Sequence, residues 1–176
     1  MTGDEIGREL TRPWRHGEHA DLRGVEIAGG LDLSGRTLRG FDLSSARIGG
    51  DLDLSDATLG GLAWLNGARI GGTLRLDRAR TRLDLRARGL TAGGLSAEGA
   101  QIAGIFDLDG AHVSGRVRLA GAVLLANLSL EGAHLEGGLD LEGTEVMGGW
   151  WSSDPDVGRE AAANAAAVHG RHGVRR

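Results

Sequence analysis

Apolar residues recur with a short period along most of this chain. From Ala20 onward the sequence falls into units of about five residues, as in Leu31-Asp-Leu33-Ser-Gly. Each unit has two apolar residues two positions apart, which face the same side of an extended segment. The Gly, Ser, Asn and Asp residues between units favour tight turns, whereas a helix would need apolar spacings of three and four. The pattern therefore predicts short strands that turn after every unit.

The units also repeat in a longer register. Small residues recur every 11 positions at Ala46, Ala57, Ala68 and Ala79, and again from Ala100 onward. A fixed short period indicates one supersecondary unit stacked on itself. The chain is therefore expected to form a solenoid with an aliphatic core.

Comparison of every fourth unit indicates how many sides each coil has. One group begins with large residues and another mostly with small ones, while a third has β-branched residues at its second inward position. This side-specific pattern favours a four-sided coil of about 22 residues over one of 11. Six coils at ~4.8 Å each predict a rod near 30 Å long, with ~25 cal/mol for each Å² of apolar surface buried. The three groups are Leu31, Leu52, Leu74, Leu95, Val117 and Leu139; Arg36, Ala57, Ala79, Ala100, Ala122 and Thr144; and Ile27, Ile48, Ile70, Leu90, Val113 and Leu135.

From Ala20 to Val146 these units resemble the pentapeptide-repeat family, whose unit is a small residue, any residue, Leu or Phe, and two more. The resemblance implies an all-β solenoid, a right-handed four-sided β-helix of about six coils. The chain departs from the family pattern in two ways. Large residues often occupy the first inward position, and alternate corners carry a sixth residue.

The two ends of the chain lie outside the repeat. Residues 1–19 are expected to form an N-terminal cap, with a capping box at Thr2 and Glu5 starting a short helix. The β-helix is predicted over residues 20–149. Residues 150–170 are predicted to close it with Trp150 and Trp151 and a helix over 159–168, and residues 171–176 to be disordered. The Ala-rich ending resembles the C-terminal helices through which some pentapeptide-repeat proteins dimerise.

The repeat is irregular between Thr81 and Gly94. Thr81 replaces an inward aliphatic residue, the next corner is reduced to Arg82, and Arg88 falls where a small inward residue belongs. A bulge or a short protruding loop is expected here.

An apolar ridge is the first candidate site. Trp64 interrupts a row of outward Asp residues, and apolar residues recur at the corner that leads into the same side. Exposed apolar patches mark contact sites. The ridge is expected to bind this protein's own terminal helix, a second copy in a homodimer, or a foreign protein. Its other residues are Leu62, Ile105, Val123 and Leu125, with Met147 beyond them.

Rows of outward charged residues are the second candidate site. Stacked like charges ~5 Å apart repel each other, so a row of Asp residues is either kept for a partner or neutralised by neighbouring Arg residues. One side is predicted to carry Asp21, Asp42, Trp64, Asp84, Asp107 and Ser129, and the next Glu26, Arg47, Arg69, Gly89, His112 and His134.

Composition narrows the function classes. The 176 residues carry a net charge of −4, include no Cys, and contain no apolar run of ~18 residues that could span a membrane. All 20 basic residues are Arg, and those near residues 75–88 form a girdle and not the stripe that a nucleic acid prefers. His112 and His134 would stack on one side but make a poor metal site, because structural zinc wants four ligands. We expect a cytoplasmic protein with no cofactor, metal, catalytic site or direct contact with nucleic acid or membrane.

Three functions follow from these features. The first is a non-catalytic scaffold that binds a protein partner or forms a homodimer. The second comes from the family resemblance, because some pentapeptide-repeat proteins imitate duplex DNA and bind DNA gyrase, although 20 Arg against 24 acidic residues is less acidic than such mimicry needs. The third is a self-assembling structural protein.

Overall fold

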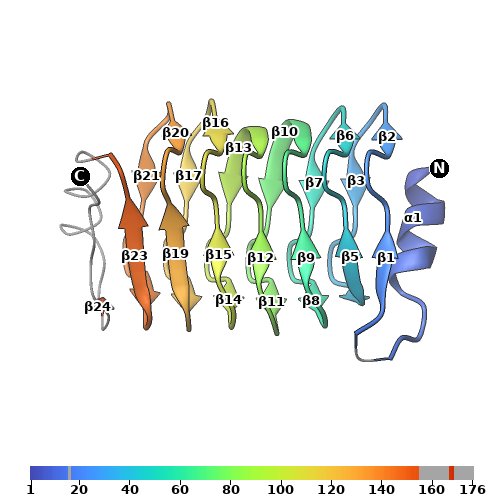
Figure 1. The fold of residues 1–176 in the computed structure, drawn as a ribbon, viewed down its shortest axis with the longest axis horizontal. Coiled ribbons are helices and arrows are strands. Elements are labelled where there is room, and N and C mark those ends of the chain that lie inside the picture. The colour runs from blue at the N-terminus through green and yellow to red at the C-terminus, as the bar shows by residue number, and fades with distance from the viewer. Residues whose placement is uncertain (16, 155–166, 169–176) are drawn as a thin grey trace.

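The protein is a β-solenoid whose N-terminal end carries a short helix (Figure 1). The computed structural model describes residues 1–15, 17–154 and 167–168. Four short strands make one coil, and strands of successive coils pair in parallel. No helix in these described parts is long and apolar enough to cross a bilayer.

The strands stack into four sides. Sides 2 and 3 are continuous where β10 (Arg69–Arg75) and β13 (Thr91–Ser96) each run through both. Side 1 holds β1 (His19–Asp21), β5 (Gly40–Asp42), β9 (Ala63–Trp64), β12 (Leu85–Arg86), β15 (Phe106–Asp107), β19 (Asn127–Leu130) and β23 (Gly149–Ser152). Side 2 holds β2 (Glu26–Ile27), β6 (Arg47–Ile48), β16 (His112–Val113) and β20 (His134–Leu135). Side 3 holds β3 (Leu31–Asp32), β7 (Leu52–Asp53), β17 (Val117–Arg118) and β21 (Leu139–Asp140). Side 4 holds β4 (Thr37–Leu38), β8 (Thr58–Leu59), β11 (Arg80–Thr81), β14 (Gln101–Ile102), β18 (Val123–Leu124), β22 (Glu145–Val146) and β24 (Ala167–Val168).

The solenoid is right-handed. In Figure 1 the side 1 strands run upward at the front, and the chain crosses at the top and returns behind them while successive coils advance from right to left. Ala20 pairs with Phe41, and Phe41 pairs with Ala63, so a coil takes 21 or 22 residues. The four-sided β-helix of about six coils predicted from the sequence is confirmed.

The core is built from ladders of inward side chains, and the side 1 ladder mixes small and large residues. On side 1 the ring of Phe41 is fully buried between Ala20 and Ala63, whose small side chains leave room for it. Aliphatic ladders fill the other sides, and the ladder from Leu31 to Leu139 pairs as expected. Because each layer buries apolar surface on the next, most of the stability comes from these ladders.

The N-terminal cap forms as the sequence predicts. Helix α1 (Gly3–Leu10) starts with a capping box in which the Thr2 side chain accepts from the N–H of Glu5 and the Glu5 side chain accepts from Thr2. Ile6 and Leu10 are fully buried in the core cluster. The helix therefore shields the first coil from water.

The phase predicted around Thr81 is wrong by two residues. Leu85 and Ala87 are the inward residues here, while Leu83 is 38% exposed at the corner and Arg88 points outward. The corner therefore has three residues, 82–84, and not one. Downstream, Thr91 and Ala92 stand in the side 2 rows where Gly89 and Leu90 were expected. The register shifts between Ile70 and Thr73 of β10, opposite β13.

The C-terminal end is described in part. Trp150 is buried on the side 1 ladder above Leu128, while Trp151 is half-buried and outward, so one indole covers the core. The predicted helix over 159–168 is wrong at its last two residues, because Ala167–Val168 pairs as strand β24 with β22. The rest of that helix and the tail at 171–176 lie outside the described residues.

Glycine is required where backbones of successive coils meet. A methyl group at Gly71 would overlap the carbonyl of Gly49, whereas one at Gly29 would meet open space. We expect Gly71→Ala to lower the free energy of unfolding by about 1–3 kcal/mol through overpacking. Gly29→Ala, near the same corner two coils earlier, is the control and should change it little. Chemical denaturation measures both, and equal effects would contradict this account.

Candidate functional site

Large exposed apolar side chains gather on one edge of the solenoid, where side 4 turns into side 1. Within the described residues the exposed large hydrophobics are Met1, Leu83 at 38%, Leu125 at 56% and Met147 at 44%. All but the N-terminal Met1 lie on this edge. We call it the apolar edge, and it consists of Leu62, Leu83, Ala103, Ile105, Leu125 and Met147.

Backbone pairing aligns the apolar edge along the rod. The N–H of Leu125 donates to the carbonyl of Ile102, and the N–H of Met147 donates to that of Leu124, so the residues that follow these strands stack coil upon coil. Ala103 and Gly104 lie between Leu83 and Leu125. One row of this edge therefore carries Arg82, a flat step at Ala103, and then Leu125 and Met147, at intervals of about 4.8 Å. Leu83 lies one position farther along the corner, level with Gly104 of the next coil.

The structure places the predicted ridge residues in three settings. Leu125 is exposed on the apolar edge, and Leu62 and Ile105 are half-buried beside it. Val123 is half-buried and belongs to side 4. Trp64 is half-buried on side 1, where its ring meets His19 edge-on with centroids 5.4 Å apart.

Sequence reasoning missed Leu83 because it assigned this residue to the core. Leu83-Asp84-Leu85 and Leu85-Arg86-Ala87 both have the expected spacing of inward residues. The pairing of Leu85 with Phe106 fixes the phase, and because a coil takes 21 or 22 residues, counting along the sequence alone does not.

The predicted row of Asp residues is interrupted. Asp42 and Asp107 lie on the outward row of side 1, but Arg86 pairs with Trp64 and Asp107 in the position predicted for Asp84. Asp84 instead lies at the corner, where its carboxylate accepts from the N–H of Ile105. The outward row therefore reads Asp21, Asp42, Trp64, Arg86, Asp107 and Ser129, with one basic residue among three acidic ones.

Arg88 neutralises Asp107 on side 1 and Asp109 just after it. The carboxylate of Asp107 is only 2% exposed and lies 2.6 Å from the Arg88 guanidinium. Arg88 also contacts Asp109, at 3.0 Å. Arg86 lies 2.6 Å from Asp84, and Asp42 accepts from the N–H of Ser44. These carboxylates serve local pairing and turn formation, which favours the interpretation that Arg residues neutralise the face.

Side 4 borders the apolar edge and carries two charged residues that, unlike those of side 1, form no ion pair with the described residues. Its outward row reads Arg80, Gln101, Val123 and Glu145 on four successive coils. Arg80 and Glu145 are exposed, and neither makes an ion pair within the described part of the chain. A positive and a negative charge thus lie three coils apart on the same side.

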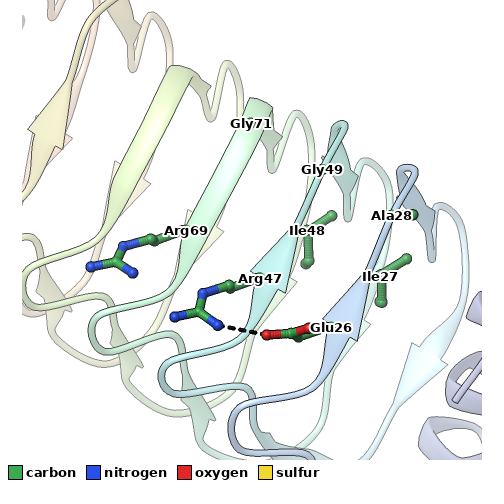
Figure 2. Close-up of a pocket in the computed structure, with 8 residues that line it drawn as sticks. All are labelled: Glu26, Ile27, Ala28, Arg47, Ile48, Gly49, Arg69 and Gly71. Carbon is green, nitrogen blue, oxygen red and sulfur yellow. Dashed lines mark hydrogen bonds and ion pairs between the residues drawn. The ribbon is translucent and has the colours of Figure 1, made fainter.

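A shallow groove crosses side 2 (Figure 2). Glu26, Arg47 and Arg69 point outward from three successive coils, beside a backbone corner that includes Gly49 and Gly71. The Arg47 guanidinium is bonded to Glu26 at 2.5 Å. His112 and His134 continue this row with ring centroids 6.2 Å apart, and His112 lies 3.0 Å from Glu136. Among the residues described, no group of three or more potential ligands could hold a metal ion.

The comparisons with known proteins leave the family open. The chain matches no protein-family model and no curated protein sequence. The pentapeptide-repeat resemblance therefore stays a prediction, and the function has to be argued from the geometry.

The carboxylates that bond to neighbouring groups predict how stability depends on pH. Hydrogen bonding to Arg23 lowers the pKa of Asp21 to about 2. The pKa of Asp51 is lowered by the backbone N–H of Thr73 and then by Arg75. A pKa that is lower in the folded state stabilises the fold above the ordinary pKa, and this stabilisation is lost on acidification.

We therefore expect the thermal unfolding midpoint to fall between pH about 4 and about 2 at low salt. Asp51→Asn should flatten this slope, since it removes one of the groups that gain a proton on unfolding. Calorimetry across this range measures both. An equal slope in the variant would contradict the assignment.

Proposed function

We propose that this protein is a non-catalytic scaffold that associates with a second copy of itself through the apolar edge. The observation that carries this proposal is the concentration of Leu83, Leu125 and Met147 on one edge of the solenoid. Exposed apolar side chains that gather in this way mark contact surfaces. A partner that covers them gains the free energy of burying them.

The regular spacing of the apolar edge favours a second copy as the occupant. Two identical solenoids have the same rise of about 4.8 Å per coil, so their apolar residues stay in register along the whole edge. A bound α-helix repeats every 5.4 Å and would lose register. A symmetric dimer also closes, as most soluble oligomers do.

The charges on side 4 favour an antiparallel arrangement. A two-fold axis that passes between the levels of Gln101 and Val123 brings Arg80 of one copy opposite Glu145 of the other, on both sides of the axis. The same axis places Leu125 over the flat step at Ala103 and Gly104. A parallel dimer would instead place each charged residue opposite the same residue of the other chain, and such contacts between like charges are unfavourable.

The DNA-mimic function stays a prediction, but the ion pairing weighs against it. A protein that imitates duplex DNA needs regular unpaired negative charge, whereas Asp84, Asp107 and Asp109 are bonded to Arg86 or Arg88. End-to-end self-assembly also has less support, since α1 covers the N-terminal end of the core.

The apolar edge is tested by removing its most exposed member. We expect Leu125→Ser to weaken the dimer at least about tenfold, because a central contact costs more than 1.4 kcal/mol. Sedimentation velocity over a concentration series measures this. Leu135→Ser, a half-buried residue of side 2, controls for a general loss of stability. A wild-type protein that stays monomeric at high concentration would refute the proposal.

The arrangement is tested separately by exchanging charges. Arg80→Glu and Glu145→Arg should each weaken the dimer, since each places like charges opposite one another. The double variant should recover wild-type affinity, and an equimolar mixture of the two single variants should form heterodimers. Arg69→Glu on side 2 is the matched control. If none of these changes alters the affinity of the dimer, the apolar edge is still compatible with the result, but the antiparallel arrangement is excluded.

A further inference from the structure

An aromatic pocket lies at the N-terminal end of the apolar edge. Trp14 and Trp64 are 50 positions apart in the sequence but line the same recess of about 140 Å³. His19, Leu62, Leu83 and Glu18 complete its walls. Two of the four Trp residues of a chain that is only 3% aromatic thus converge on one small pocket.

The backbone holds this pocket open. Its floor includes Gly40 and Gly61, and a methyl group at Gly61 would collide with the backbone of Gly40. The six-membered ring of Trp14 lies against Gly60, where an added methyl group would meet the ring. The ring of Trp64 contacts that of His19, with the two ring planes at 69°. The indoles are therefore positioned before any ligand arrives.

The lining of the pocket favours a positive charge. Among the residues that the structure describes, Glu18 is the one acidic residue in the lining, and no Arg lines the pocket. The Glu18 carboxylate accepts a hydrogen bond from the N–H of Arg15 at 3.1 Å, which holds it in place. Indole faces attract cations, most strongly when water is excluded. Leu62 and Leu83 add apolar surface for alkyl groups.

We propose that this pocket binds an alkylammonium group, such as a trimethylammonium or a methylated amine at the end of a flexible chain. The volume suits one such group and is too small for a nucleotide or an oligosaccharide. An anionic ligand would face Glu18 without a cationic partner in the lining. All its lining residues come from one chain, so the site requires no second copy.

The experiment compares choline with 3,3-dimethylbutan-1-ol, which has the same shape but no charge. Titration of the full-length protein is followed through the indole N–H resonances of Trp14 and Trp64 in ¹H–¹⁵N spectra. Choline should shift both resonances in a saturable way, and the neutral analogue should bind at least about tenfold more weakly.

Three variants make the test specific. Trp64→Leu keeps an apolar side chain but removes the π face, and Glu18→Gln removes the charge, so each should weaken choline binding several-fold. Trp151→Leu, a half-buried outward indole at the opposite end of the rod, should leave it unchanged. The Trp14 resonance reports whether the pocket stays folded. Equal binding of the neutral analogue, no shift with choline, or an equal loss in Trp151→Leu would overturn the proposal.

Discussion

Each coil of this solenoid must stack its inward side chains on those of the coil before it while its backbone pairs in register. This constraint decides the rest of the structure. On side 1 Phe41 stacks between Ala20 and Ala63, while farther along the same ladder Phe106 packs between Leu85 and Leu128. Where backbones approach at a corner, as at Gly49 and Gly71, only glycine fits.

The outward residues are free of this constraint, so they carry the evidence on function. On side 1 acidic and basic residues pair with one another, and Asp107 is buried by Arg86 and Arg88. On the apolar edge Leu125 and Met147 stay exposed among the residues that the structure describes. Ion pairs within the fold satisfy the first surface, and the second is the one through which we propose self-association.

The sequence was sufficient for the coil, the sides and most ladders, because inward apolar residues two apart leave an unambiguous pattern over most of the chain. It failed near Leu83, where two overlapping triplets satisfy the same pattern and only pairing with the neighbouring coils distinguishes them. Leu125 was recognised as a surface residue, but the convergence of Trp14 and Trp64 was not. That contact depends on how the N-terminal segment folds back over Gly60, for which a repeat pattern has no signal.

The central claim is an antiparallel pair of solenoids joined at the apolar edge, and distances between the two copies test it most directly. The natural chain has no Cys, so one introduced Cys provides a single spin label per copy. Pulsed dipolar spectroscopy on Gln101→Cys should give a short distance, since this position lies beside the two-fold axis. Thr37→Cys, more than three coils from the axis, should give a separation of about 30 Å or more along the rod. Short distances at both positions would indicate a parallel dimer, and no dipolar coupling at either would contradict self-association altogether.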